Sequence, residues 1–449
     1  MTYQTSPSTY ALFPNMVIEP VFTVTGDNGP KANTQQIVGK MMDVMRPICY
    51  CNEIFVYDDR VHHYTRDQGH IDTFVAKTLN LLNLPVNNPS VKFEAKMAAM
   101  VTNVASVHPF KPQIDAINCK NGVVLLTLDG LKLVPHSPDY MFDYCIDTNF
   151  DMKWHLHTPE LDTILCDWGH RDILIDIPAI ALVQKLREYS FKTAFMIEGG
   201  PDTGKTTWLD LLKFTFGLKN YSETGLSDLS GGNRFALSTL EHKLVNIADE
   251  VPVITVKNTD MFKRLTGSCR HQIERKFEGQ KQGVLTAPLV FACNELPIVT
   301  LAGDVAFWGR WHLIEFGKRF NRDMTKQASI LSEPVREQLL MRALLRSLDI
   351  LRNGWNNPQS ADHVIDYWMR RTVDVDLFLS DSVMHADYKD KLLLEEIHHR
   401  YENWCKAQEP PRSPMSKYKV SRRLLEMGYR KDIHHAGGVR FTGINWKFA

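Results

Sequence analysis

The chain has 449 residues, enough for roughly three domains at ~150 residues each. Hydrophobic residues make up 44% and charged residues 23%, which excludes collagen-like and wholly disordered proteins. Lys plus Arg total 52 and Asp plus Glu total 52, so the net charge does not indicate a polyanionic partner, and any basic surface must be local.

Cysteine spacing and hydropathy bear on the compartment. The eight cysteines form no Cys-x-x-Cys pair, and no histidines lie near them at zinc-ligand spacing. This pattern favours reduced thiols. Adjacent histidines such as His62-His63 point apart on a strand or helix, so they do not indicate a metal site. No apolar run approaches about 20 residues. We expect no export, no membrane insertion and a cytoplasmic location.

The first 150 residues divide into two parts. Residues 1–35 mix Pro, Ser, Thr and Gly with short apolar pieces, which predicts an irregular amino-terminal arm. Residues 36–150 combine apolar residues at three- and four-residue steps with strand-like runs, Asn-Gly and Asp-Gly turns, and a short hairpin around Asp58-Asp59. This pattern predicts a mixed α+β amino-terminal domain.

The strongest pattern is G-x-x-x-x-G-K-[ST] at residues 199–206. A β-prone run at 193–197 precedes it and a run with helical spacing at 208–214 follows, which argues against a chance glycine-rich turn. In such a loop the backbone wraps phosphate, Lys205 reaches the β- and γ-phosphate oxygens, and Thr206 ligates Mg²⁺. The predicted nucleotide-binding residues are Gly199, Gly200, Pro201, Asp202, Thr203, Gly204, Lys205, Thr206 and Thr207.

Two further strands end in polar residues. Residues 244–248 lead to Asp249 and Glu250; we expect Asp249 to ligate magnesium and Glu250 to polarise the attacking water, although a solvated turn also places acids at a strand end. Residues 289–293 lead to Asn294, whose amide could position water or contact the γ-phosphate, or could serve only the turn.

Arg310 lies between Trp308 and Trp311. A cation fixed there could stabilise transition-state charge across a subunit boundary. The alternative is an arginine stacked on an aromatic surface.

Taken in order, these elements resemble the superfamily 3 helicases, and within them the poxvirus and satellite-phage primase-helicase group. The resemblance rests on the P-loop, the strand ending at Asp249, residues 263–267, residues 294–297 and residues 304–310. It implies an AAA+-like ring ATPase that uses ATP and Mg²⁺. It also implies a homo-oligomer, with a hexamer expected, in which each subunit presents Arg310 to its neighbour.

Two departures from the group are visible. The family often has two adjacent arginines where this chain has Gly309-Arg310. Long members also carry a polymerising primase domain, whereas residues 1–115 contain no convincing carboxylate triad. We therefore expect a separate primase or polymerase as a partner, or a longer parent protein.

A basic hairpin is predicted between the acidic pair and Asn294. Residues 272–284 have β-prone flanks around a glycine-containing turn. In a ring motor such a hairpin projects into the channel, where its cations follow phosphates and its aromatic residue stacks on a base; a solvated charged hairpin is the alternative. The predicted DNA contacts are Arg275, Lys276, Phe277 and Lys281.

The carboxy-terminal third begins with a helical connector, residues 331–385, in which Ser332 and Gly354 bound one long helix. Residues 386–449 look like a small winged-helix domain. Between 412 and 440 eight Lys or Arg face only two acids, which favours nucleic acid over protein docking. The predicted contacts are Lys419, Arg422 and Arg423.

The sequence therefore predicts an α/β protein with an AAA+-like P-loop core at residues 151–330, flanked by the amino-terminal and winged-helix domains. The expected function is an ATP-dependent replicative DNA helicase of a virus, phage or mobile element. It would act in the host cytoplasm on single-stranded and forked DNA. An ATP-switched replication initiator or origin-binding protein is the alternative, and a protein-remodelling ATPase is a third possibility.

Overall fold

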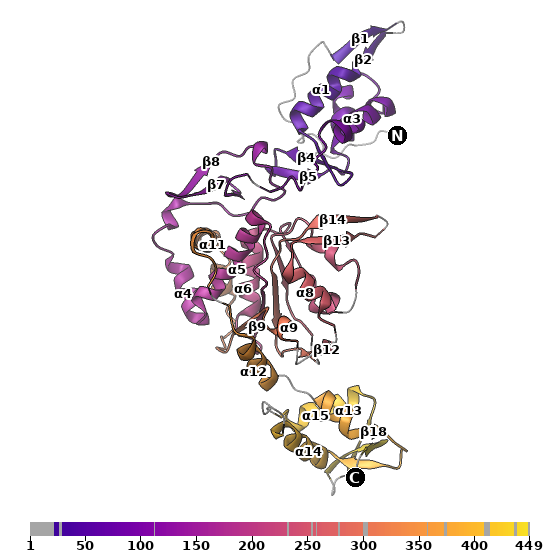
Figure 1. Ribbon diagram of the computed structural model, residues 1–449, viewed down its shortest axis with the longest axis vertical. Coiled ribbons are helices and arrows are strands. Elements are labelled where there is room, and N and C mark those ends of the chain that lie inside the picture. Colours follow the sequence, from indigo (N-terminus) through magenta and orange to yellow (C-terminus); the bar gives the residue numbers. More distant parts are fainter. Residues whose placement is uncertain are drawn as a thin grey trace.

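The fold is taken from a computed structural model with three bodies along its long axis (Figure 1). No helix in the described part of the chain is both long and apolar enough to cross a bilayer. The structure describes residues 22–26, 29–111, 113–230, 233–252, 255–256, 258–276, 279–299, 304–356, 358–371, 375–407, 414–434 and 438–447.

The amino-terminal body has a helical core. Buried residues such as Ile37, Phe74 and Val91 pack three helices together, and an antiparallel sheet with the predicted turn at Asp58-Asp59 lies beside them. Its elements are β1 (Thr23–Gly26), β2 (Gly29–Ala32), α1 (Thr34–Met45), β3 (Ile48–Tyr50), β4 (Glu53–Asp58), β5 (His63–Arg66), α2 (His70–Leu81) and α3 (Pro89–Thr102).

The structure differs from the expected division of this part of the chain at two points. The described part of the expected irregular arm contains the antiparallel pair β1 and β2, because Thr23, Val24 and Thr25 are β-branched and pair readily. Residues 116–150 share one buried core with residues 161–350. The sheet in that segment comprises β6 (Ala116–Cys119), β7 (Gly122–Thr127) and β8 (Gly130–Val134).

The central body is built on a five-stranded parallel sheet, in the order β10-β11-β15-β9-β17. Side chains of a strand alternate between its faces. Phe195 and Ile197 accordingly join one core, and Ala194 and Met196 join another. The strands are β9 (Ala194–Glu198), β10 (Tyr221–Ser222), β11 (Val245–Ala248), β15 (Leu289–Cys293) and β17 (Trp311–Glu315).

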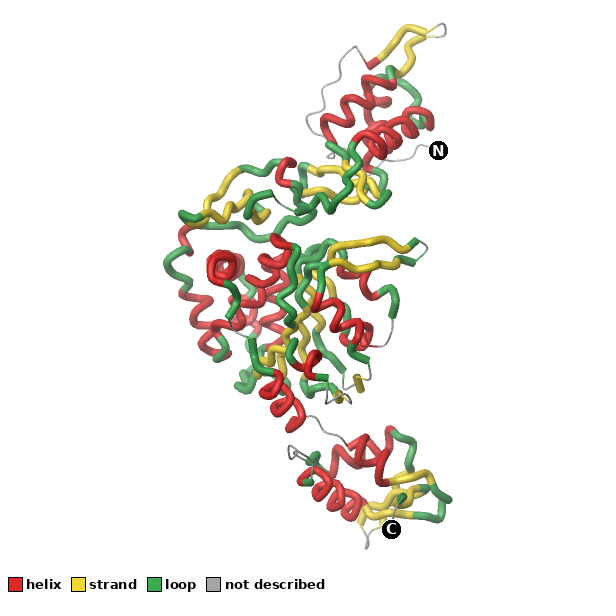
Figure 2. Tube along the Cα trace, in the orientation of Figure 1, coloured by secondary structure: helices red, strands yellow, loops and turns green. Residues whose placement is uncertain are grey.

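Helices cover both faces of this sheet (Figure 2). The apolar residues of α5, α6 and α11 form the first core, and those of α8, α9 and α12 the second. The helices of the central body are α4 (Pro159–Trp168), α5 (Arg171–Arg187), α6 (Lys205–Phe216), α7 (Leu226–Ser230), α8 (Asp260–Gly267), α9 (Val305–Trp308), α10 (Met324–Ile330), α11 (Glu333–Asn353) and α12 (Ala361–Arg371).

Short elements complete this body. The predicted basic hairpin is present, and its two strands pair antiparallel. A second, two-stranded sheet is parallel. These elements are η5 (Ala236–Leu240), β12 (Thr255–Val256), β13 (Arg270–Glu274), β14 (Gln280–Val284) and β16 (Ile298–Val299).

The expected connector, residues 331–385, is not a separate unit. Its long helix begins after Ser332 and ends before Gly354 as predicted, but Leu339 and Leu344 are buried in the core of the central body. The helix is therefore part of that core. At the other end, Val375 and Leu379 lie in the core of the carboxy-terminal body, so that body begins before residue 386.

The carboxy-terminal body combines three helices with short antiparallel strands. Its assignment as a winged helix stays a prediction. Its elements are α13 (Val375–Ser382), β18 (Val383–His385), β19 (Lys391–Leu393), α14 (Leu394–Lys406), α15 (Lys417–Glu426), β20 (Arg430–His434), β21 (Gly438–Thr442) and β22 (Ile444–Trp446).

Candidate functional site

The glycine-rich loop joins the carboxyl end of β9 to the first residue of α6. Gly204 adopts φ 90°, a left-handed conformation that glycine tolerates best. A Cβ atom at Gly204 would also lie 2.5 Å from Nε1 of Trp168, and one at Gly199 would meet the Phe316 carbonyl oxygen. Close packing therefore requires glycine at both positions, and the backbone conformation requires it at Gly204 as well.

Lys205 begins α6 and is buried, with 8% of its surface exposed. Its ammonium donates hydrogen bonds to the carbonyl oxygens of Gly199 and Gly200, at 2.5 and 2.8 Å, and to Oδ1 of Asn294, at 3.0 Å. Burial lowers the pKa of Lys205 from its usual value. The hydrogen bond to Asn294 brings together two predicted site residues that are 89 positions apart.

The acidic pair lies at the same edge of the sheet. Asp249 and Glu250 follow β11, and β15 with Asn294 stands between β11 and the P-loop strand β9. The Glu250 amide donates to Oδ1 of Asp249 at 2.9 Å, and Glu250 has φ 55°. Parallel strands place their carboxyl ends together, so the predicted motor residues Lys205, Asp249, Glu250 and Asn294 line one cavity.

The donor set suits magnesium held with nucleotide. Thr206 offers a hydroxyl and Asp249 a carboxylate in that cavity, and Mg²⁺ is usually held by one or two carboxylates together with substrate phosphates. Among the residues described, no group of three or more His, Cys, Asp or Glu side chains could hold a metal by itself. A metal here would therefore depend on phosphate oxygens.

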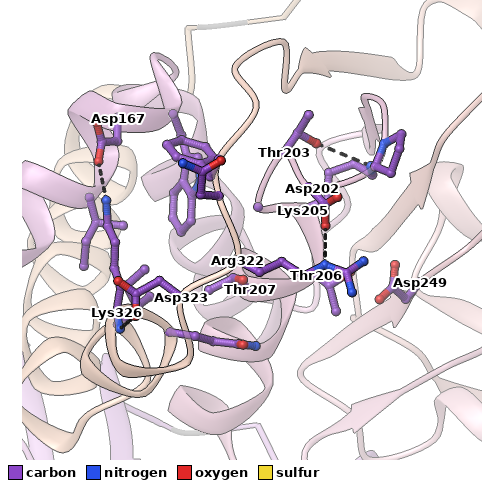
Figure 3. Close-up of a pocket in the computed structure, with 18 of the residues that line it drawn as sticks. Asp167, Asp202, Thr203, Lys205, Thr206, Thr207, Asp249, Arg322, Asp323 and Lys326 are labelled. Carbon is purple, nitrogen blue, oxygen red and sulfur yellow. Dashed lines mark hydrogen bonds and ion pairs between the residues drawn. The ribbon is translucent and has the colours of Figure 1, made fainter.

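The cavity measures about 530 Å³ and has a second, apolar wall (Figure 3). Ile164 and Trp168 come from α4, while Phe320, Met324 and Ile330 come from α10 and the segment before it. Sequence reasoning missed this wall, because its residues come from two segments about 150 residues apart that no sequence motif connects. The aromatic residue inside the basic run at 318–322 was the available signal.

Cations lie beside the glycine-rich loop. Arg322 pairs with Asp202 at 3.0 Å, and Lys318 and Lys326 pair with Asp167 at 2.7 and 3.1 Å. Hydrogen bonds from Lys318 and Lys326 lower the pKa of Asp167. The wall can thus offer both an apolar surface and positive charge to a bound nucleotide.

Arg310 does not line this cavity. It directly precedes β17, and its carbonyl accepts a hydrogen bond from the first residue of β9, Ala194. It therefore lies at the amino edge of the sheet, opposite the P-loop. Its guanidinium donates to the Ala306 carbonyl oxygen, burial lowers its pKa, and its Nε has no partner within the described structure.

The predicted DNA contacts lie on two elements. On the hairpin, Arg275 and Lys281 are engaged in ion pairs, Lys276 is exposed, and Phe277 lies outside the described residues. On α15, Lys419 pairs with Glu295 of the motor, and the two arginines pair with Glu426. The arginine pairs are Arg422–Glu426 and Arg423–Glu426.

Comparisons with known proteins identify two matching stretches. Residues 40–170 match a family described as D5 N terminal like, and residues 197–305 match a family of unknown function, DUF5906. No curated protein matches.

Solved structures that align include "The A form apo structure of NrS-1 C terminal region-CTR", at 12% identity, 92% coverage of this chain, 100% of that chain and TM-score 0.46. Another is "The apo structure of NrS-1 C terminal region (305-718)", at 11% identity with the same coverages and TM-score. Both matching domains are typical of viral and phage primase-helicase proteins, so the chain is related to viral and phage replication proteins in these two stretches.

Proposed function

We propose that the chain is an ATP-dependent replicative DNA helicase of a virus, phage or mobile element, and that it works as a homo-oligomeric, hexameric ring. The observation that carries the proposal is the hydrogen bond between Lys205 and Asn294 in a cavity that Asp249 and Glu250 also line. These four side chains are the ones that binding and cleaving a nucleoside triphosphate requires.

ATP would lie with its phosphates along the loop from Gly199 to Thr206 and its base against Trp168 and Phe320. Thr206 and Asp249 would hold magnesium, which neutralises charge on the β- and γ-phosphate oxygens when bound. Lys205 would exchange one of its protein acceptors for a γ-phosphate oxygen.

Hydrolysis follows from the positions of the remaining groups. Glu250 would accept the proton of a water molecule whose oxygen attacks the γ-phosphorus, while the bond to the β–γ bridging oxygen breaks and releases ADP. Asn294 would position the water or the γ-phosphate. Arg310, at the opposite edge of the sheet, would serve the cavity of a neighbouring subunit.

DNA contact is proposed for two elements of the chain. The hairpin β13–β14 presents Lys276 at its tip, and α15 carries Lys419, Arg422 and Arg423 on a helix with a buried opposite face at Val420 and Leu424. Such cations bind phosphate without reading sequence. A separate primase or polymerase would supply primers.

The direct test is ATP-dependent displacement of a labelled strand from a forked DNA duplex. Wild type should displace the strand. Lys205→Ala should bind ATP poorly and displace nothing, whereas Glu250→Gln should still bind ATP but fail to hydrolyse it. If wild type hydrolyses ATP and displaces nothing, the helicase assignment fails and the ATP-switched initiator takes its place.

A further inference from the structure

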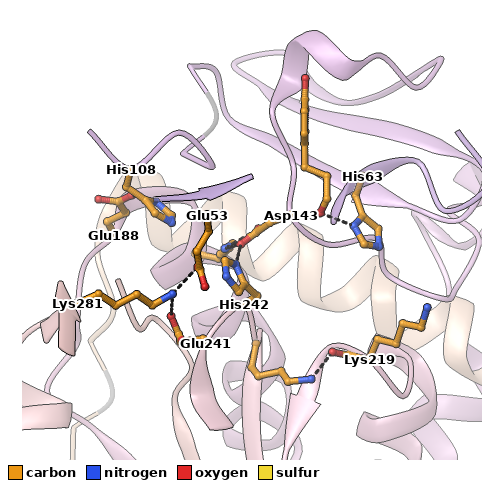
Figure 4. A network of polar contacts seen from close by, with 12 residues as sticks. Glu53, His63, His108, Asp143, Glu188, Lys219, Glu241, His242 and Lys281 are labelled. Atoms are coloured by element: carbon orange, nitrogen blue, oxygen red, sulfur yellow. Dashed lines mark hydrogen bonds and ion pairs between the residues drawn. The ribbon is translucent and has the colours of Figure 1, made fainter. Parts of the chain in front are cut away.

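Two carboxylates hold two of the three hairpin cations that the sequence assigns to DNA, Arg275 and Lys281. Glu53 accepts from Nη1 of Arg275 and Nζ of Lys281, both at 2.6 Å. Glu241 accepts from Nε of Arg275 at 2.6 Å and from Nζ of Lys281 at 2.9 Å. We call these four residues the hairpin latch; Figure 4 shows Lys281 between its two carboxylates.

The latch joins parts of the chain that are remote in sequence. Glu53 begins β4 in the amino-terminal body, whereas Glu241 follows η5 in the motor, and the cations flank the hairpin tip. The side chains of Glu53 and Glu241 are only 9% and 7% exposed, and those of Arg275 and Lys281 are 18% and 17% exposed. Ion pairs buried to this extent hold one geometry, unlike most surface pairs.

A second contact lies beside the latch. Cys51, in the turn between β3 and β4, donates from Sγ to the Gln282 carbonyl oxygen of β14 at 3.6 Å. Arg66 of β5 also pairs with Glu53, at 2.9 Å. The amino-terminal body therefore reaches the hairpin through the Cys51 thiol and through the Glu53 carboxylate, which Arg66 also holds.

The carboxylates occupy the same donors that phosphates would use. Arginine binds carboxylate and phosphate with the same planar fork, and lysine acts as a point charge toward either anion. One set of donors cannot serve Glu53 and a DNA phosphate at once. Replacing one anion by another keeps each buried cation paired, so the exchange avoids the large cost of an unpaired buried charge.

We propose that Glu53 is an intramolecular competitor of single-stranded DNA: it holds Arg275 and Lys281 in a state closed to DNA, and phosphates of the incoming strand displace it. Glu241, which belongs to the motor, stays at the base of the hairpin. The amino-terminal body is thereby released from the hairpin when DNA enters. This inference rests on the proposed DNA-dependent function.

The first test measures binding of a fluorescent single-stranded oligonucleotide by anisotropy, over a range of NaCl concentrations. Glu53→Gln should bind about 3- to 10-fold more tightly than wild type, because one competing charge is gone. Asp59→Asn removes a charge from an exposed site at the end of the same strand and should match wild type. Lys281→Ala added to Glu53→Gln should cancel the gain.

The second test locks the contact with a thiol that the chain already has. Gln282→Cys brings a cysteine beside Cys51, and oxidation should join the two. The oxidised protein should bind the oligonucleotide at least several-fold more weakly, and dithiothreitol should restore binding. The matched control, Cys51→Ser with Gln282→Cys, should not respond to oxidant.

The outcomes separate the two proposals. Suppose that wild type binds DNA, and that Glu53→Gln and the oxidised Gln282→Cys protein bind it as tightly as wild type does. The latch is then wrong and the DNA function stands. If neither wild type nor Glu53→Gln binds DNA at low salt, the DNA function and the latch are both wrong. Tighter binding by Glu53→Gln together with reversible loss on oxidation supports the latch.

Discussion

Glu250 combines an unfavourable backbone conformation with the proposed role of general base. Its φ of 55° lies in the left-handed region, which costs a residue with a Cβ roughly 1 kcal/mol or more. The Glu250 amide donates to Asp249 in this conformation. The conformation of Glu250 therefore places its amide where it orients the Asp249 carboxylate.

Replacing Glu250 separates stability from hydrolysis. Glu250→Gly should have a free energy of unfolding up to about 1 kcal/mol higher than that of Glu250→Gln, because glycine adopts positive φ without steric cost. Its melting temperature should be higher accordingly. Both variants should lose hydrolysis by at least about 10²-fold. Differential scanning calorimetry and phosphate release measure the two effects. Equal melting temperatures would show that Glu250 is not strained, and retained hydrolysis would remove its role as the base.

The contrast between Asp249 and Phe320 shows what could be predicted at the scale of single residues. Lys205, Asp249, Glu250 and Asn294 each end or begin an element with a recognisable pattern, so their convergence followed from the geometry of a parallel sheet. Phe320 has no such pattern. Its position depends on a loop crossing over the P-loop, where the Phe320 amide donates to the Asp202 carbonyl oxygen at 2.8 Å.

At the scale of elements, α12 is attached to the carboxyl edge of the central sheet. Arg371 donates to Glu198 at 2.7 Å and to Glu315 at 2.8 Å, so it bridges the carboxyl ends of β9 and β17. Tyr367 donates to Glu198 at 2.8 Å, and burial raises the pKa of Tyr367 well above its usual value. Glu198 directly precedes the glycine-rich loop.

Loss of this bridge should weaken nucleotide binding from outside the cavity. In Arg371→Ala, Glu198 and Glu315 lose their shared cation, and the added negative potential beside the phosphate site should raise the Kd for a fluorescent ATP analogue about 3- to 10-fold. Arg371→Lys should recover part of the affinity, since lysine keeps the charge but lacks the fork. An unchanged Kd in Arg371→Ala would mean that the bridge is structural only.

The sequence predicts where α11 begins and ends, but it does not predict which part of the chain the helix packs against. Its capping residues are local, so Ser332 and Gly354 mark the helix without reference to the rest of the chain. Its packing against α5 depends on partners about 170 residues earlier. The same reason explains why the sequence places the β6–β8 sheet in the amino-terminal domain although its apolar residues complete the core of the central body.

At the scale of the whole molecule, the position of Arg310 decides whether it can act within its own copy of the chain. A β-strand rises about 3.3 Å per residue, so the five residues of β9 and β17 separate Arg310 from its own P-loop by roughly 16 Å. Its guanidinium cannot cross that distance. Any catalytic role of Arg310 requires a second copy of the chain.

This requirement can be tested by mixing two inactive proteins. Lys205→Ala keeps Arg310, and Arg310→Ala keeps the P-loop, so hydrolysis should appear when the two are combined at mixed interfaces. Lys205→Ala mixed with Glu250→Gln is the matched control and should stay inactive, because neither protein has an intact cavity. Hydrolysis that stays absent in the first mixture, while light scattering shows mixed assemblies, would rule out Arg310 as the shared cation.

The hydrogen bonds of Lys205 have a consequence for selectivity. An ammonium group has three protons, and Lys205 donates to three protein acceptors within 3.0 Å. A small anion such as sulfate or inorganic phosphate would have to break one of these bonds without the binding energy that a base and a phosphate chain contribute. If the site binds a nucleoside triphosphate as proposed, these internal acceptors would act as a filter against the common anions of a cell.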